Sequence, residues 1–339
     1  MHFLEHVPLA PHTTFKIGGP ARWFAEAASE EEMLEGVHFA RSRHLPLFIL
    51  GGGSNLLVSG EGFPGLVLHV ANRGIEQQED TFRVAAGEDW DHFVSYAVER
   101  NYSGIECLAG IPGTVGGTPV QNVGAYGQEV SETIFNVRVL NLNTLGFEDL
   151  QSAACGFAYR QSIFNTTERG RYLVTRVDYK IARNGEPRIA YADLKKHFGE
   201  NAAPTLAEVS TAVRSIRHQK GMLIMPDDPD CRSAGSFFKN PIISAEHYAR
   251  IAGRYEKEIP RYPAPSGQVK LPAAWLLEQA GFHKGYTLGE AGISSRHTLA
   301  LINRGHAEAD DILALRDRII AEVQNRFQIR LEPEPVYVS

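Results

Sequence analysis

The sequence predicts an α+β protein with two or three domains. Its 339 residues exceed what one ordinary hydrophobic core organises. Short apolar runs typical of strands alternate with amphipathic segments typical of helices, which is the pattern of a mixed fold. A glycine-dense stretch at 104–127 interrupts this alternation, and irregular stretches of that length inside a domain usually carry function.

The individual elements follow from caps, periodicity and β-branched content. Helices are expected after the capping residues Ser29 and Thr205, over 89–100 and from Asp310 because of their apolar faces, and over 271–280, where Gly281 ends the helix. Strands are expected over 45–50, 66–70, 82–86, 134–142 and 172–181. Residues 225–231 contain two prolines and three aspartates, so we predict a surface linker there and a domain boundary near residue 219.

Composition excludes several classes of protein. The formal net charge of -6 argues against a nucleic-acid surface. Three cysteines without a C-x-x-C pair predict neither a disulfide framework nor a structural metal site. No apolar run approaches about 20 residues, and the N-terminus lacks the basic and apolar regions of a signal peptide. We therefore expect a cytoplasmic protein that does not insert into a membrane.

Three glycine clusters are the candidates for a cofactor site. The first comprises Gly51, Gly52, Gly53, Ser54 and Asn55; the second Gly110, Ile111, Pro112, Gly113, Thr114, Gly116 and Gly117; the third Asn122, Gly124, Ala125, Tyr126 and Gly127. Glycine lets backbone N–H groups approach a pyrophosphate closely, although most glycine-rich turns are only structural. The P-loop and Rossmann signatures are both missing, so the clusters favour a flavin-binding architecture of another kind.

Three further residues are candidates for chemistry. Ser236 follows small residues and precedes two phenylalanines, an arrangement that either presents one hydroxyl or simply forms a buried strand. Arg160 lies among aromatic residues, where a guanidinium binds a carboxylate or phosphate or makes a surface salt bridge. Glu334 stands between two prolines, and the alternative to a role in chemistry is that it is an ordinary solvated carboxylate.

These motifs, taken in order, resemble the UDP-N-acetylenolpyruvoylglucosamine reductases from Thr14 to Glu334. The resemblance rests on Thr14-Phe15, Gly18-Gly19 and the segments 51–57, 110–117, 122–127, 159–164, 234–241, 270–279 and 331–334. It implies an FAD-binding domain of the vanillyl-alcohol-oxidase type over 1–218, with two α/β subdomains that meet near residue 70. It also implies a smaller α/β substrate-binding domain over 219–328 and a C-terminal segment, 329–339, that returns to the FAD domain and the active site.

The resemblance also implies a reaction. FAD, bound non-covalently since no His or Cys attachment motif is evident, would accept electrons from NADPH and reduce UDP-N-acetylglucosamine enolpyruvate to UDP-N-acetylmuramate for peptidoglycan synthesis. Ser236 would be the proton donor, and Arg160 and Glu334 would act on the substrate carboxylate. The implied substrate contacts are Tyr191, Asn240 and Gln279, with Lys220, Lys239 and Lys270 as alternatives at the diphosphate.

Two other functions remain open at this point. One is a flavin-dependent oxidase of the same superfamily that acts on a small alcohol, and the other is a nucleotide-sugar sensor without activity. We expect the protein to be a monomer.

Overall fold

The structure is a computed structural model that describes residues 1–199 and 202–339. The chain divides into two compact units, each built from more than one segment. The first unit comprises Met1–Pro8, Pro20–Gly53 and Phe63–Ile224; the second comprises Leu9–Gly19, Ser54–Gly62 and Met225–Ser339. The predicted boundary at 218/219 falls shortly before this division, and the two N-terminal segments of the second unit were not anticipated.

The first sheet of the first unit contains four strands. In spatial order they are β1 (Leu4–Pro8), β2 (Pro20–Ala27), β5 (Phe63–Val70) and β3 (Leu47–Leu50). Strand β5 is parallel to both β2 and β3, whereas β1 is antiparallel to β2. Helix α1 (Glu30–Ser42) packs on this sheet with Met33, Val37 and Ala40 buried, and the Ser29 side chain caps it by accepting from the Glu32 amide at 3.2 Å. The predicted start of this helix is confirmed.

The second sheet of the first unit contains five antiparallel strands. In spatial order they are β12 (Phe147–Gln151), β11 (Ile134–Asn141), β13 (Tyr172–Lys180), β7 (Thr81–Ala85) and β6 (Ile75–Gln78). Two short strand pairs, β8 (Tyr102–Ser103) with β14 (Ala182–Arg183) and β9 (Gly124–Ala125) with β10 (Gln128–Glu129), lie outside it.

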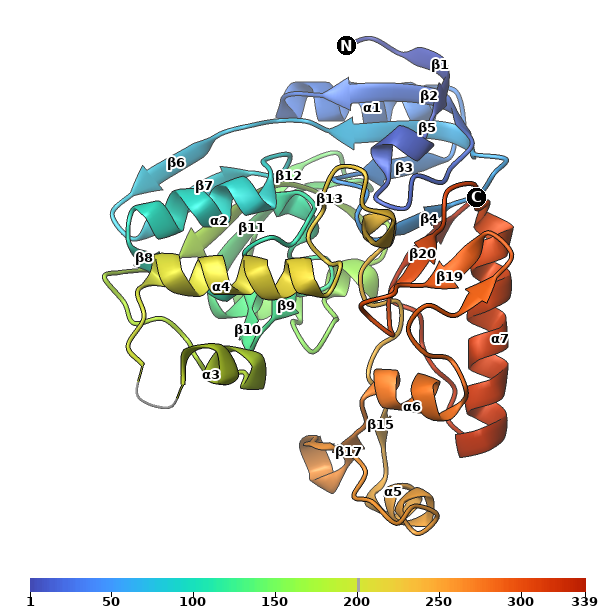
Figure 1. Ribbon diagram of the computed structural model, residues 1–339. Coiled ribbons are helices and arrows are strands. Elements are labelled where there is room, and N and C mark those ends of the chain that lie inside the picture. Colours follow the sequence, from blue (N-terminus) through green and yellow to red (C-terminus); the bar gives the residue numbers. More distant parts are fainter. Residues whose placement is uncertain (200–201) are drawn as a thin grey trace. The chain divides into compact units, whose positions relative to one another are not determined.

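Helices α2 (Trp90–Glu99) and α4 (Leu206–Gln219) run alongside each other in this unit, and α3 (Ala192–Phe198) lies near α4 (Figure 1). The apolar side chains of the five-stranded sheet and of α2 and α4 belong to one buried core. The capping box predicted for α4 is present in both directions, because the Glu208 amide donates to Thr205 Oγ1 and the Thr205 amide donates to Glu208 Oε2.

The second unit combines small sheets with three helices. Its strands are β15 (Ile242–Ile243), β17 (Val269–Lys270) and β16 (Tyr262–Pro263) in one sheet; β18 (Thr287–Leu288), β19 (Ala291–Ile293) and β20 (Leu301–Asn303) in another; and β4 (Leu56–Val58) with β21 (Val336–Val338) in a third. Its helices are α5 (Ala245–Ala252), α6 (Ala273–Gln279) and α7 (Ala309–Phe327). The predicted apolar stripe of α7 is confirmed: Ile312, Leu315, Ile319, Val323 and Phe327 are all buried.

The C-terminal strand pairs with a segment from the N-terminal part of the chain. Strand β21 is parallel to β4, with Val336 opposite Leu56 and Val338 opposite Val58. Sequence reasoning put residues 56–58 into the first domain, but their contacts group them with the second unit. The C-terminal segment is therefore ordered by a partner that the second unit itself contains.

The segment expected to be a surface linker, 225–231, is instead anchored. Asp230 is buried, accepts from Arg296 Nε at 2.9 Å, and accepts from Ser295 Oγ at 2.7 Å. Asp228 forms a second ion pair with Arg296. Residues 225–227 and Pro229 are exposed, as predicted for a surface segment, but the prediction was wrong at Asp230, whose carboxylate is a buried hydrogen-bond acceptor although composition alone indicates solvent exposure.

Candidate active site

The first and second glycine clusters touch through their backbones. A Cβ atom built on Gly52 would lie 2.5 Å from Gly113 Cα and 3.1 Å from the Thr114 nitrogen. A Cβ on Gly51 would lie 2.8 Å from Thr114 Oγ1. Gly53 and Gly113 have φ values of 64° and 125°, which side chains rarely allow. Glycine is therefore required here by close approach and by backbone conformation.

The touching loops expose backbone donors. Within the described residues, the amides of Gly52, Gly53, Gly113 and Thr114 donate no hydrogen bond to the chain. Gly53 is itself buried, so its N–H group needs a partner. Open amides on two abutting glycine loops fit the pyrophosphate of a dinucleotide such as FAD.

The second cluster is held by α2 and α4. The Trp90 amide donates to the Gly113 carbonyl at 3.1 Å, and the Gly110 amide donates to Asp91 Oδ1 at 2.5 Å. Arg217 is 5 % exposed and donates from Nε to the Gly110 carbonyl at 3.0 Å. Burial lowers the pKa of Arg217. Sequence reasoning missed this residue, although its position four residues after Val213 on the apolar face of α4 was a usable signal.

The third cluster packs against the segment that carries Arg160. Asn122 donates from Nδ2 to the Ala158 carbonyl at 3.1 Å, and Ser162 Oγ donates to the Val120 carbonyl at 2.6 Å. A Cβ on Gly124 would lie 3.3 Å from Arg160 Nη1. The structure thus brings the Arg160 guanidinium beside the third glycine cluster, with Arg160 itself in the left-handed region at φ 56°.

Tyr126, Tyr191 and Lys220 form one group at the edge of the third cluster. The rings of Tyr126 and Tyr191 meet edge-on with centroids 5.4 Å apart. Lys220 Nζ lies 5.9 Å from the centre of the Tyr126 ring and 2.6 Å from Asp193 Oδ2. Burial raises the pKa of Tyr126, and the nearby cations Arg217 and Lys220 oppose the rise. Two predicted substrate contacts, Tyr191 and Lys220, therefore lie next to a predicted cofactor contact.

In the second unit, the C-terminal segment runs antiparallel beside the segment of Ser236. The Glu334 amide donates to the Phe237 carbonyl at 2.9 Å, and Phe238 forms an isolated bridge with Pro333. Asn55 donates from Nδ2 to the Glu334 carbonyl at 3.2 Å. Ser236 and Glu334, almost a hundred positions apart in the sequence, are therefore neighbours. Asn55, predicted as a cofactor contact, lies with them, as does the chain leaving Ser54.

The remaining predicted substrate contacts have partners of their own in the second unit. Lys239 Nζ lies 2.5 Å from Glu332 Oε1. Asn240 accepts from the Ala273 amide at 2.8 Å and so supports the start of α6, and Gln279 ends that helix half-buried. Lys270 pairs in β17 with both neighbouring strands, and its Nζ lies 6.0 Å from the centre of the Tyr262 ring. Arg160 belongs to the first unit, whereas Ser236 and Glu334 belong to the second.

Comparison with known proteins identifies the class and then the family. Residues 21–144 match the model of an FAD binding domain, and this range contains all three glycine clusters. The chain is therefore a flavoprotein, and its fold class, an FAD-binding domain with a smaller C-terminal α/β domain, is as predicted. Residues 227–338 match the C-terminal domain of UDP-N-acetylenolpyruvoylglucosamine reductase.

Relatives extend the match to the whole chain. UDP-N-acetylenolpyruvoylglucosamine reductase of Thermobifida fusca is 46% identical over 99% of this chain and 98% of its own length. The enzyme of Streptomyces coelicolor is 44% identical over 99% of this chain and 90% of its own length. The crystal structure of the Thermus caldophilus reductase covers 100% of this chain and 98% of its own, with a TM-score of 0.68 at 25% identity. The chain belongs to the UDP-N-acetylenolpyruvoylglucosamine reductase family, which confirms the predicted resemblance.

No helix in the described part of the chain combines the length and the apolar character that crossing a membrane requires.

Proposed function

We propose that this protein reduces UDP-N-acetylglucosamine enolpyruvate to UDP-N-acetylmuramate, with FAD as its cofactor and NADPH as the reductant, in peptidoglycan synthesis. The observation that carries the proposal is the pair of abutting glycine loops with open amides, in a chain related over its whole length to reductases of that name. An oxidase acting on a small alcohol is not favoured, because residues 227–338 match the C-terminal domain of the reductases and relatives of that name match 99% of the chain.

The residues that would hold FAD are those of the glycine clusters. The amides of Gly52, Gly53, Gly113 and Thr114 can donate to the pyrophosphate, and the third cluster provides Tyr126 and Gly127 beside it. When bound, FAD supplies the hydride that the enol ether accepts at its methylene carbon.

Arg160 is the residue we assign to charge stabilisation. Reduction of the enol ether builds negative charge on the carbon that bears the carboxylate, and the charge spreads into that carboxylate. A guanidinium can pair with both carboxylate oxygens, and preorganised help of this kind is often worth about 3–4 kcal/mol. Arg160 is half-buried beside Gly124, which limits how far the guanidinium can move.

Ser236 and Glu334 are the residues we assign to the proton. The Ser236 hydroxyl donates a proton to the carbon next to the carboxylate, which completes the reduction of the double bond. Glu334 assists by a hydrogen bond to the substrate. The antiparallel pairing of their two backbone segments supports this assignment, because it fixes the two residues relative to each other. Tyr191, Lys220, Lys239, Asn240, Lys270 and Gln279 are assigned to the nucleotide sugar.

We also propose that the enzyme is a cytoplasmic monomer. An activated sugar nucleotide and NADPH are both substrates of that compartment, and sedimentation of the purified enzyme measures the monomer directly. A dimer at micromolar concentration would contradict this part of the proposal.

The test separates the two half-reactions. NADPH should reduce the flavin, and the enolpyruvyl substrate should reoxidise it far faster than air does. Ser236→Ala should leave reduction by NADPH nearly unchanged and slow reoxidation by substrate about a thousandfold or more, since it removes the proton donor of the second step alone. Ser244→Ala is the matched control, because its hydroxyl only caps α5. Equal slowing of both half-reactions would reject the role of Ser236, and faster reoxidation by air than by substrate would reject the reductase.

A further inference from the structure

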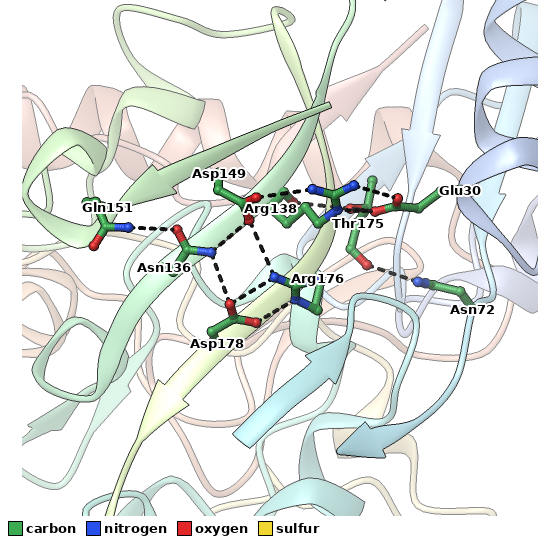
Figure 2. A network of polar contacts seen from close by, with 9 residues as sticks. All are labelled: Glu30, Asn72, Asn136, Arg138, Asp149, Gln151, Thr175, Arg176 and Asp178. Atoms are coloured by element: carbon green, nitrogen blue, oxygen red, sulfur yellow. Dashed lines mark hydrogen bonds and ion pairs between the residues drawn. The ribbon is translucent and has the colours of Figure 1, made fainter. Parts of the chain in front are cut away.

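The five-stranded sheet of the first unit carries a connected polar network (Figure 2). Its members are Glu30, Asn72, Asn136, Arg138, Asp149, Gln151, Thr175, Arg176 and Asp178. Arg138 on β11 is its centre. Its Nε and Nη2 donate to the two Glu30 oxygens at 2.8 and 3.1 Å, and its Nη1 donates to Asp149 Oδ2 at 3.1 Å. Glu30 is the first residue of α1, so Arg138 ties the helix of the first sheet to two strands of the second.

Isolated surface ion pairs contribute little to the free energy of unfolding, but two features strengthen the pair of Arg138 with Glu30. Both nitrogens of the bidentate pair are used, and about three-quarters of each side chain is withdrawn from solvent, with 26% and 28% exposed. The bond to Glu30 raises the pKa of Arg138 further above its ordinary value. Thr175 adds a third donor, because its Oγ1 lies 2.6 Å from Glu30 Oε1.

A β-bulge aims Thr175 at Glu30. Along β13, Arg176 is opposite Arg138 and Val174 is opposite Val139, so Thr175 is the extra residue between two neighbouring pairs. Bulges of this kind redirect a side chain and are common near functional sites. Thr175 is 1% exposed, and its hydroxyl is therefore a fixed part of the interior.

Two backbone hydrogen bonds connect Thr175 to the second glycine cluster. The Thr175 carbonyl accepts from the Ala86 amide at 3.0 Å, and the Ala86 carbonyl accepts from the Gly116 amide at 2.7 Å. A Cβ on Gly116 would lie only 2.6 Å from Ala86 Cβ, so Gly116 and Ala86 are already in close contact. Asn72 reinforces it, because Asn72 donates to the Thr175 carbonyl at 2.9 Å and accepts from the Gly87 amide at 2.9 Å.

The first glycine cluster is connected to α1 through strands β3 and β5. It follows β3, which is paired with β5, and α1 packs tightly on β5, since a Cβ on Gly36 would lie 2.7 Å from Leu68 Cδ1. A displacement of α1 from the second sheet would thus carry the first cluster away from the second. The contact of Gly52 with Gly113 stops the two loops from moving closer, but it cannot stop them from moving apart.

We propose that Glu30, Arg138 and Thr175 form a clamp that fixes the spacing of the two glycine loops and thereby sets the affinity for FAD. The three are positioning residues, because they act through the sheets and the loops and have no assigned contact with the cofactor. The proposal rests on the proposed function, in that the glycine loops are taken as the FAD cradle. Its consequence is that FAD affinity depends on hydrogen bonds between α1 and the five-stranded sheet.

The test measures release of FAD from the holoenzyme on dilution, by the recovery of flavin fluorescence. Thr175→Val keeps the shape of the side chain and removes the hydroxyl, whereas Thr175→Ser keeps the hydroxyl. Thr175→Val and Arg138→Gln should each raise the dissociation constant about tenfold, which equals about 1.4 kcal/mol. Thr175→Ser should restore wild-type affinity to within about twofold, because the bond to Glu30 is retained.

Arg176→Gln is the matched control. Arg176 belongs to the same network and pairs with Asp178 and Asp149, but it makes no bond to α1. It should lower the melting temperature about as much as Arg138→Gln and leave the FAD dissociation constant unchanged. Because Thr175 and Arg138 act on the same Glu30 carboxylate, the double variant should lose less than the sum of the single losses.

Three results would overturn the clamp. The first is a Thr175→Val variant that melts at a lower temperature yet binds FAD as tightly as wild type. The second is an Arg176→Gln variant that releases FAD as readily as Arg138→Gln does. The third is a double variant of Thr175 and Arg138 whose loss of FAD binding free energy equals the sum of the two single losses. Failure of the wild-type protein to bind any FAD is a distinct outcome, because it would remove the proposed function along with the clamp.

Discussion

Replacing Gly52 with alanine should loosen FAD by forcing the two glycine loops apart. Gly52 has no positive φ, so an alanine fits its backbone conformation and only the close contact opposes it. The new Cβ would lie 2.5 Å from Gly113 Cα, whereas ordinary contact begins at 3.4 Å, so the loops must separate by 3.4 − 2.5 = 0.9 Å. The atoms in the way are backbone atoms, which cannot rotate aside as a flexible side chain can.

Overpacking of this kind costs about 1–3 kcal/mol. If the bound state must close the gap again, that cost appears in FAD binding as a rise in the dissociation constant of about 5- to 150-fold. The assay is titration of flavin release, with circular dichroism to establish that each variant is folded. Gly60→Ala is the control, because a Cβ there meets no atom within 4 Å and the backbone needs no positive φ.

Gly117→Ala separates two causes of weakened binding. A Cβ at Gly117 also meets no protein atom within 4 Å, so any loss of FAD in that variant comes from contact with the cofactor itself. An affinity of Gly52→Ala within about twofold of wild type would refute the reasoning, because the two loops could then separate without consequence for the cradle.

The remaining predictions concern the cofactor link and acid stability. Acid precipitation should release FAD into the supernatant, whereas flavin retained on the pellet would contradict non-covalent binding. Burial tends to raise the pKa of Asp230, but hydrogen bonds from Ser295 and Arg296 outweigh it and lower the pKa below its usual value. A lowered pKa adds stability that is complete above about pH 5 and is lost as the pH falls through the folded-state pKa, below about 3.9. Arg296→Gln should therefore lower the free energy of unfolding by about 2 kcal/mol at pH 7, and the loss should shrink as the pH falls below about 3.9, so a penalty independent of pH would contradict this account.

Local patterns were sufficient to predict several elements of the fold. The capping box of Thr205 and Glu208 marks the start of α4 because both partners lie within one helical turn. The buried stripe of α7 follows from helical periodicity in the same way. The burial of Asp230 could not be predicted, because its partners, Ser295 and Arg296, lie some 65 residues further along the chain.

In the candidate site, too, local features could be predicted and contacts between distant residues could not. Glycine density marked the loops that we assign to the cofactor, since each cluster is local, and the ordered motifs predicted the family that the relatives confirm. The contact of Gly52 with Gly113, by contrast, joins two loops about 60 residues apart, and the bond of Arg138 to Glu30 spans 108 positions. Arg138 and Thr175 carry no local signal, because a single arginine or threonine within a strand is ordinary. Only the register of β11 with β13 reveals the bulge that directs Thr175 inward.

The discontinuity of the second unit gives the first glycine cluster a further role. The cluster begins in the first unit with Gly51 and ends in the second with Asn55, whose side chain donates to the Glu334 carbonyl and whose own carbonyl accepts from the Val336 amide at 2.9 Å. The chain therefore passes, within five residues, from the loop assigned to the pyrophosphate to the backbone that orders Glu334. Ser236 is one residue from the bond that holds Glu334, between the Glu334 amide and the Phe237 carbonyl. Gly53 is the last residue of the first unit before this junction, and its φ of 64° is a conformation that glycine adopts without strain, so a residue with a side chain there would oppose the path that the chain takes toward Asn55.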